Sequence, residues 1–151
     1  MINLQTVLWG KLILGLGLIL DVHLASAAGI SDDEARSLTA DMVLMKFESG
    51  VKTCETLGAS NLPALYDAMR QLSQLRAELV PSVDSKLIHD AKVSYQRGMA
   101  ALPVPEVTAR DQIALICDRT LEKIQGMAPE SLLRIVDSGA KNYQQLFARA
   151  E

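Results

Sequence analysis

Residues 31–58, SDDEARSLTADMVLMKFESGVKTCETLG, contain a helix start, a helix stop and one cysteine between them. Ser31 can cap a helix here, and Glu34 can bond back to the cap, which makes a capping box. Gly58 is suited to end the helix. Between them the apolar residues recur every three or four positions and form one broad stripe, which comprises Leu38, Met42, Leu44, Met45, Phe47, Val51 and Cys54. We therefore expect a long helix that ends at Leu57 and has Cys54 on its core face.

The chain beyond Gly58 repeats this kind of pattern four more times, and no window shows the sustained alternation of a strand. A second helix is expected at 62–79, because Pro81 forbids its continuation. The third is expected from Ser82 to about residue 102, antiparallel and adjacent to the second because the turn is short. The last two are expected at about 106–125 and 129–147, with Pro129 in the first turn of the latter. These patterns predict an all-α bundle of about five helices.

The two cysteines, Cys54 and Cys117, both lie on apolar helical faces, 63 residues apart. In an oxidising compartment such a pair is expected to form a disulfide. A redox-active pair would ordinarily have a CxxC spacing, which is missing here. Two free, buried cysteines are the remaining alternative.

A Cys54–Cys117 bridge restricts how the helices can pack. In a flush up-and-down bundle, the first helix ends at the level where the fourth begins, so Cys117 would lie about 16 Å below that level and Cys54 only about one turn below it. The Cα atoms of a disulfide lie within about 7 Å of each other. The bridge therefore predicts that the first and fourth helices are staggered or cross. We favour crossing, with Gly50 permitting close approach, and hence an irregular bundle stapled by one disulfide.

The residue types at the beginning of the chain follow the order that is typical of a signal peptide. Residues 12–20, LILGLGLIL, form an apolar run that follows Lys11 and precedes small residues. Ala25 and Ala27 fit the subsites of a signal peptidase, which would cut between Ala27 and Ala28. A membrane-spanning helix is the alternative, but it needs about 20 apolar residues, more than this run provides.

Cleavage divides the chain into a signal peptide, residues 1–27, and a single helical domain, residues 28–151, that is long enough to bury a core. The predicted location is the periplasm or the extracellular space, with no permanent membrane anchor. The net charge is −3 and no basic cluster is present. This charge argues against nucleic acid and anionic lipid as partners.

Few residues of the predicted domain are suited to catalysis. His23 is lost with the signal peptide, which leaves His89, followed by Asp90, as the single histidine. There is no nucleophile motif such as GxSxG and no set of closely spaced zinc ligands. The acidic residues are spread over polar helix faces beside Lys and Arg, unlike the paired acids of glycosidases. We therefore expect no enzymatic activity and no metal site, with His89 a solvated helix residue.

Haem is the one cofactor that the composition suggests, because its iron could be held between His89 and a methionine. The methionines available are Met42, Met45, Met69, Met99 and Met127. Covalent attachment would require CxxCH, which is absent, and methionine at helical spacing usually fills a core. We expect no cofactor.

Binding to another protein is the remaining class of function, and two versions compete. In the first, the protein is an inhibitor or an immunity protein that occludes a target outside the cytoplasm and needs no catalytic residues. This is an analogy of class. In the second, it is a periplasmic chaperone or a carrier whose methionine-rich interior takes up an unfolded client or an apolar ligand.

Two stretches are candidate partner-binding surfaces. ALPVPEV, residues 101–107, holds Val104 between Pro103 and Pro105, so an exposed apolar side chain would have little conformational entropy to lose. A plain, stiff connector is the alternative. The second stretch, YDAMRQLSQLR, residues 66–76, forms the outer side of the second helix and carries residue types that are enriched at interface hot spots, namely Tyr66, Arg70 and Arg76.

Overall fold

The computed structural model describes residues 29–149, and this part of the chain is built from helices without a strand. The helices are α2 (Asp32–Thr56), α3 (Leu62–Leu79), α4 (Lys86–Ala100), α5 (Arg110–Gln125) and α6 (Pro129–Ala148). The predicted all-α class and the number of five helices are therefore confirmed for the described residues. The predicted signal peptide, residues 1–27, and the predicted cut at Ala27/Ala28 lie outside them.

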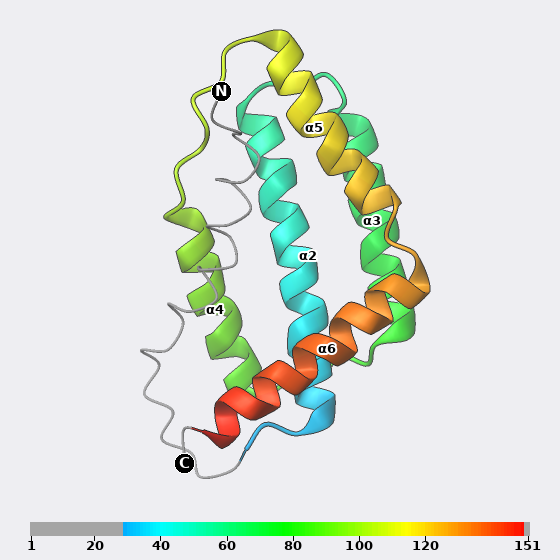
Figure 1. The fold of residues 1–151 in the computed structure, drawn as a ribbon, viewed down its shortest axis with the longest axis vertical. Coiled ribbons are helices and arrows are strands. Elements are labelled where there is room, and N and C mark those ends of the chain that lie inside the picture. The colour runs from blue at the N-terminus through cyan, green and yellow to red at the C-terminus, as the bar shows by residue number, and fades with distance from the viewer. Residues whose placement is uncertain (1–28, 150–151) are drawn as a thin grey trace.

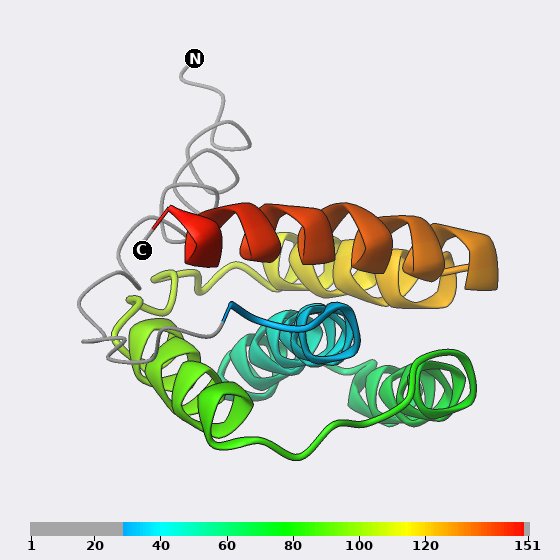
Figure 2. The same ribbon diagram turned by 90° about the horizontal axis from the view of Figure 1, so that it is seen from below.

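The helices form two layers, and α2 packs against α3, α4, α5 and α6 (Figure 1). Seen from below, α5 and α6 form one layer, and α2, α3 and α4 form the other (Figure 2). In Figure 1, α6 crosses α2 steeply near the start of α2. The bundle is therefore irregular, as predicted, although the prediction placed the crossing between α2 and α5, whereas the steep crossing is that of α6 over α2.

The predicted disulfide links α2 to α5. Cys54 and Cys117 are fully buried, and their Cα atoms are 5.7 Å apart. Gly50 lies one turn earlier on α2, where an added Cβ would be 3.3 Å from the side chain of Thr120 on α5. The two helices therefore approach closely beside the bridge, as the sequence predicted.

The ends of α2 also agree with the sequence. The Ser31 hydroxyl accepts a hydrogen bond from the Glu34 backbone, and the Glu34 carboxylate accepts one from the Ser31 backbone, which completes the capping box. After the helix, Gly58 has a φ of 70°, a left-handed conformation that favours glycine. The chain can therefore turn at this point toward α3.

The predicted starts of the third and fourth helices are wrong by about one turn. Helix α4 begins at Lys86 and not at Ser82, and Ser85 caps it by accepting a bond from the Ile88 backbone. The residues between α3 and α4 have tertiary partners instead, because the Ser82 hydroxyl accepts a hydrogen bond from Arg76. Helix α5 likewise begins at Arg110, not at about residue 106.

The predicted neighbour of α4 is also wrong. Helix α4 runs antiparallel to α3, but α2 lies between the two helices (Figures 1 and 2). The connection at residues 80–85 is not helical and carries the chain from one side of α2 to the other. Helix α4 therefore packs against α2 rather than α3.

The core consists of two clusters of buried residues. The first cluster joins α2, α3, α5 and α6 and contains the disulfide; its members are Ala40, Val51, Cys54, Ala59, Leu65, Ala68, Met69, Leu72, Val80, Cys117, Ile124, Leu132 and Val136. The second cluster joins α2, α4 and α6; its members are Ile30, Ala35, Leu38, Met42, Met45, Ile88 and Ala140. Helix α4 contributes to the second cluster only.

Candidate functional site

The connection between α4 and α5, residues 101–109, is called the strap below. Val104 is 44% exposed and Leu102 51% exposed, while Pro103 is exposed and Pro105 is half-buried. A residue before proline is biased away from the α-helical region toward extended conformations, and both Leu102 and Val104 precede a proline. The strap therefore presents two apolar side chains on a backbone with little freedom. The sequence prediction missed Leu102 by assigning it to the preceding helix, although its place before Pro103 was a signal.

Part of the second predicted surface, on α3, is exposed. Tyr66 is 48% exposed at the start of α3, and Arg70 is exposed and forms an ion pair with Asp67 on the same helix. Partial desolvation, and after it the hydrogen bond and charge of the Glu55 carboxylate, raise the pKa of Tyr66. Tyr66 and Arg70 are thus accessible to a partner.

Arg76 is not on the outer side of α3, so this part of the prediction is wrong. The side chain is buried, with the residue 5% exposed, and its Nη2 atom lies 2.8 Å from Oδ1 of Asp41 on α2. It donates hydrogen bonds to the Val80 carbonyl at 3.0 Å, to the Ser82 hydroxyl at 2.6 Å and to the Ser37 hydroxyl at 3.2 Å. Arg76 follows Leu72 by four residues and shares its inward face. Its role is to fix α3 and the connection at residues 80–85 to α2.

Asp41 extends this network to α4. Its Oδ2 atom accepts a hydrogen bond from Lys92 at 2.8 Å, while Oδ1 is paired with Arg76. The Val83 backbone N–H donates to the Ser37 hydroxyl at 3.1 Å. Three helices thus meet at the Asp41 carboxylate, and the connection at residues 80–85 joins the network through Arg76 and Ser37.

An open pocket of about 490 Å³ borders this network. Its lining comes from α2, α3, α4 and the connection between α3 and α4: Asp41, Leu44, Arg76, Ala77, Ser82, Val83, Asp84, Ile88, His89 and Lys92. Carboxylates and cations are mixed in this lining, so the pocket selects neither an anion nor a cation. His89 is exposed at its edge.

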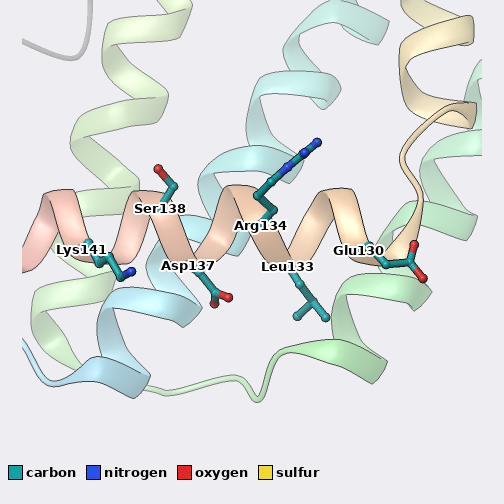
Figure 3. Close-up of a pocket in the computed structure, with 6 residues that line it drawn as sticks. All are labelled: Glu130, Leu133, Arg134, Asp137, Ser138 and Lys141. Carbon is teal, nitrogen blue, oxygen red and sulfur yellow. The ribbon is translucent and has the colours of Figure 1, made fainter.

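A second open pocket, of about 540 Å³, lies on the outside of α6 (Figure 3). Its lining comes from α6 alone: Glu130, Leu133, Arg134, Asp137, Ser138 and Lys141. Figure 3 shows these side chains spreading from one helix rather than converging. Asp137 is also paired with Arg36 of α2. A single helix face encloses no ligand, so we do not assign a binding site here.

Residues 29–149 contain no group of three or more His, Cys, Asp and Glu side chains arranged to hold a metal ion. Met42, Met45 and Met69 are buried in the core, whereas His89 is exposed. Within the same residues no helix is both long and apolar enough to cross a membrane. The buried disulfide fits an oxidising compartment.

The two accessible surfaces do not meet. The strap lies on the side of α4, and α3 lies on the opposite side of α2 (Figures 1 and 2). We therefore treat Val104 and Tyr66 as separate hypotheses.

Comparison with protein families, with characterised proteins and with solved structures finds no match for this chain.

Proposed function

We propose that this protein is exported and acts by binding another protein, as inhibitors and immunity proteins do. The observation that carries the proposal is the strap, where Leu102 and Val104 are exposed and each is held by a following proline. Side chains that are already ordered lose little entropy on binding, so more of the contact energy contributes to affinity. No catalytic group is needed for such a role.

Export is supported by two independent features. The order of residues 1–28 is typical of a cleaved signal peptide, and the buried Cys54–Cys117 bridge is of the kind that forms outside the cytoplasm. The mass of the protein recovered from the periplasm tests the first feature directly. A chain that begins at Ala28 is expected, and a chain that retains residues 12–20 would contradict cleavage.

Partner capture tests the role of the strap. The oxidised domain, residues 28–151, is immobilised and exposed to a periplasmic extract, and one stoichiometric partner is expected. Val104→Asp should abolish capture, because it places a charge in the centre of the proposed contact. Ile135→Asp is the matched control, since Ile135 is exposed to a similar extent, 41%, but lies on α6.

Three results would contradict the proposal. They are the absence of a stoichiometric partner, capture that survives Val104→Asp, and a loss of capture in Ile135→Asp as large as that in Val104→Asp. Tyr66→Asp is tested in parallel, because it reports on the separate surface of α3. Loss of capture in Tyr66→Asp alone would move the binding surface from the strap to α3.

A chaperone or carrier is the second candidate, and one observation favours it. The second cluster contains Met42 and Met45, and α4 covers it with a single buried residue, Ile88. Methionine side chains adapt to apolar ligands of different shape. Suppression of the aggregation of an unfolded client, without a stoichiometric partner, would favour this candidate over the inhibitor.

A further inference from the structure

Helix α4 is attached to the molecule by few contacts. Of the residues from Lys86 to Ala100, only Ile88 is buried. Helix α5 has two buried residues, but one of them is Cys117 in the disulfide. Helix α4 has no covalent tie of this kind, so its position depends on one apolar face and a few polar contacts.

The surroundings of α4 are also open. It packs mainly against α2, and the pocket beside Lys92 and His89 separates it from α3. Non-helical connections flank it on both sides, residues 80–85 and the strap. Residues 80–83 are held by Arg76 and Ser37, so residues 84–85 and residues 106–109, beyond the two prolines of the strap, absorb the backbone rotation that a movement of α4 would require. The other four helices stay joined by the first cluster and the disulfide.

The polar contacts allow α4 to leave without a large penalty. Its main ion pair joins Lys92 to Asp41, and the Lys92 side chain is already 38% exposed. When Lys92 leaves, Asp41 keeps its pair with Arg76 at 2.8 Å. No buried charge is left without a partner, which is the costly outcome in such networks.

Departure of α4 uncovers an apolar groove between α2 and α6. Met42 and Met45 of α2 belong to the cluster that α4 covers, and Tyr143 and Phe147 of α6 pack against it. The face that α4 turns to this groove carries Ile88, Ala91, Lys92 and Tyr95. The groove is therefore shaped for an amphipathic helix with a cation positioned to reach Asp41.

We propose that α4 opens as a unit on residues 84–85 and 106–109, and that the groove it leaves binds an amphipathic helix of a partner with the pattern of α4. This proposal rests on the fold and not on partner capture by the strap. Its tests need no extract and no identified partner, so its failure is distinguishable from failure of the proposed function.

Native-state hydrogen exchange tests the opening. Amides of residues 90–100 are expected to exchange at least about tenfold faster than those of residues 45–56, through a local event that does not expose the first cluster. Lys92→Glu should accelerate exchange in α4 alone, because it turns the contact with Asp41 into a repulsion. Exchange of α4 and α2 as one cooperative unit would overturn the proposal.

A labelled synthetic peptide of residues 84–101 tests the groove. It should bind the full domain carrying Ile88→Asp, whose own α4 is released, and should bind the unaltered domain at least about tenfold more weakly, because the resident helix competes. The same peptide with Ile88→Asp is the matched control and should not bind. Where the Ile88→Asp domain does not fold, the Lys92→Glu domain replaces it. Absence of peptide binding to a folded domain whose α4 exchanges freely would overturn the proposal, as would equal binding to both domains.

Discussion

The two sides of α2 are held by different means. On one side the first cluster joins four helices, contains most of the core and includes a covalent bridge between α2 and α5. On the other side α4 rests on the second cluster through Ile88 and is tied by the ion pair between Lys92 and Asp41. One side has several independent attachments that include a covalent bridge, and the other has fewer attachments and no covalent one.

This difference implies that stability is unevenly distributed along the chain. A helix that is held by several independent contacts opens only when the whole domain unfolds, whereas a helix held by few contacts can open alone. Substitutions that affect the side of α2 with the first cluster and the disulfide should therefore change global stability. Substitutions that affect the side with α4 should change the local opening of that helix.

Removal of the bridge has the largest expected effect. The double change Cys54→Ala with Cys117→Ala should lower the free energy of unfolding by about 4 kcal/mol, because the unfolded chain loses a constraint on a loop of some 64 residues. Urea unfolding measures this loss. The free energy of local opening of α4, measured by hydrogen exchange, should stay unchanged. An equal fall in both quantities would contradict a separate α4 side.

Replacement of Arg76 comes next. Arg76→Met should cost about 3 kcal/mol, because it removes the buried partner of Asp41 and the hydrogen bonds that Arg76 donates to the Val80 carbonyl and the Ser82 hydroxyl. The measurement is again urea unfolding. A cost near zero would mean that methionine packing replaces the network, as is known for some buried ion pairs.

Lys92→Met is the matched control for Arg76→Met, because both side chains bond to the same carboxylate. The Lys92 side chain is partly exposed, so its loss should cost less than about 1 kcal/mol of global stability. Its effect should instead be visible as faster exchange in α4. If Lys92→Met lowers the free energy of global unfolding as much as Arg76→Met does, α4 and α3 belong to the same cooperative unit.

The sequence was sufficient for the features that depend on near neighbours in the chain. The capping box at Ser31, the stop at Gly58 and the stripe around Cys54 are local patterns, and the structure agrees with each of them. The departure from a flush up-and-down bundle was also predictable, because the bridge from Cys54 to Cys117 is hard to form in one.

The position of α4 was not predictable in the same way. It depends on contacts between residues far apart in the chain, such as the Val83 N–H with the Ser37 hydroxyl and Arg76 with Asp41. Arg76 was misjudged because arginine is usually exposed. Its spacing from Leu72 was the available signal, since it continues the inward face of α3.

The candidate site was predicted in part. Val104 is exposed between its two prolines, as expected, and Tyr66 is exposed on α3. Leu102 was missed, and the separation of the strap from α3 could not be deduced, because it follows from the side of α2 on which α4 lies.

Two glycines, one in α6 and one in α4, allow the two sides of α2 to be compared by substitutions with smaller expected effects. An added Cβ on Gly139 of α6 would lie 2.4 Å from the Thr39 side chain of α2, whereas at Gly98 of α4 nothing lies within 4 Å. Gly139→Ala should therefore cost a net of about 1 kcal/mol, as overpacking outweighs the gain in helix propensity. Gly98→Ala should stabilise α4 by about 0.5 kcal/mol and slow its exchange.

Thr39→Ser is the control for the glycine pair, because it removes the methyl group that the new Cβ of Gly139→Ala would meet and keeps the hydroxyl that donates to the Ala35 carbonyl. Gly139→Ala should cost less in this background than alone. Thermal unfolding of the four proteins, unaltered, single and double, gives the coupling. An unchanged cost would show that the contact with Thr39 does not limit the crossing of α6 over α2.

Acid has the smallest expected effect, and it acts where the start of α2 lies beside the cap of α4. Hydrogen bonds from the Ser31 backbone, then from the Ser31 and Ser85 hydroxyls, hold the pKa of the Glu34 carboxyl below its usual value. The stabilisation is therefore complete above the ordinary glutamate pKa of about 4.3 and is lost as the pH falls through the lowered pKa. Because Glu34 completes the capping box of α2 and Ser85 caps α4, acid should reduce exchange protection in the first turns of both helices. Glu34→Gln should lower the free energy of unfolding by at most about 1 kcal/mol at neutral pH and should remove this acid response. An equal acid response in the unaltered and Glu34→Gln proteins would assign the loosening to another carboxylate.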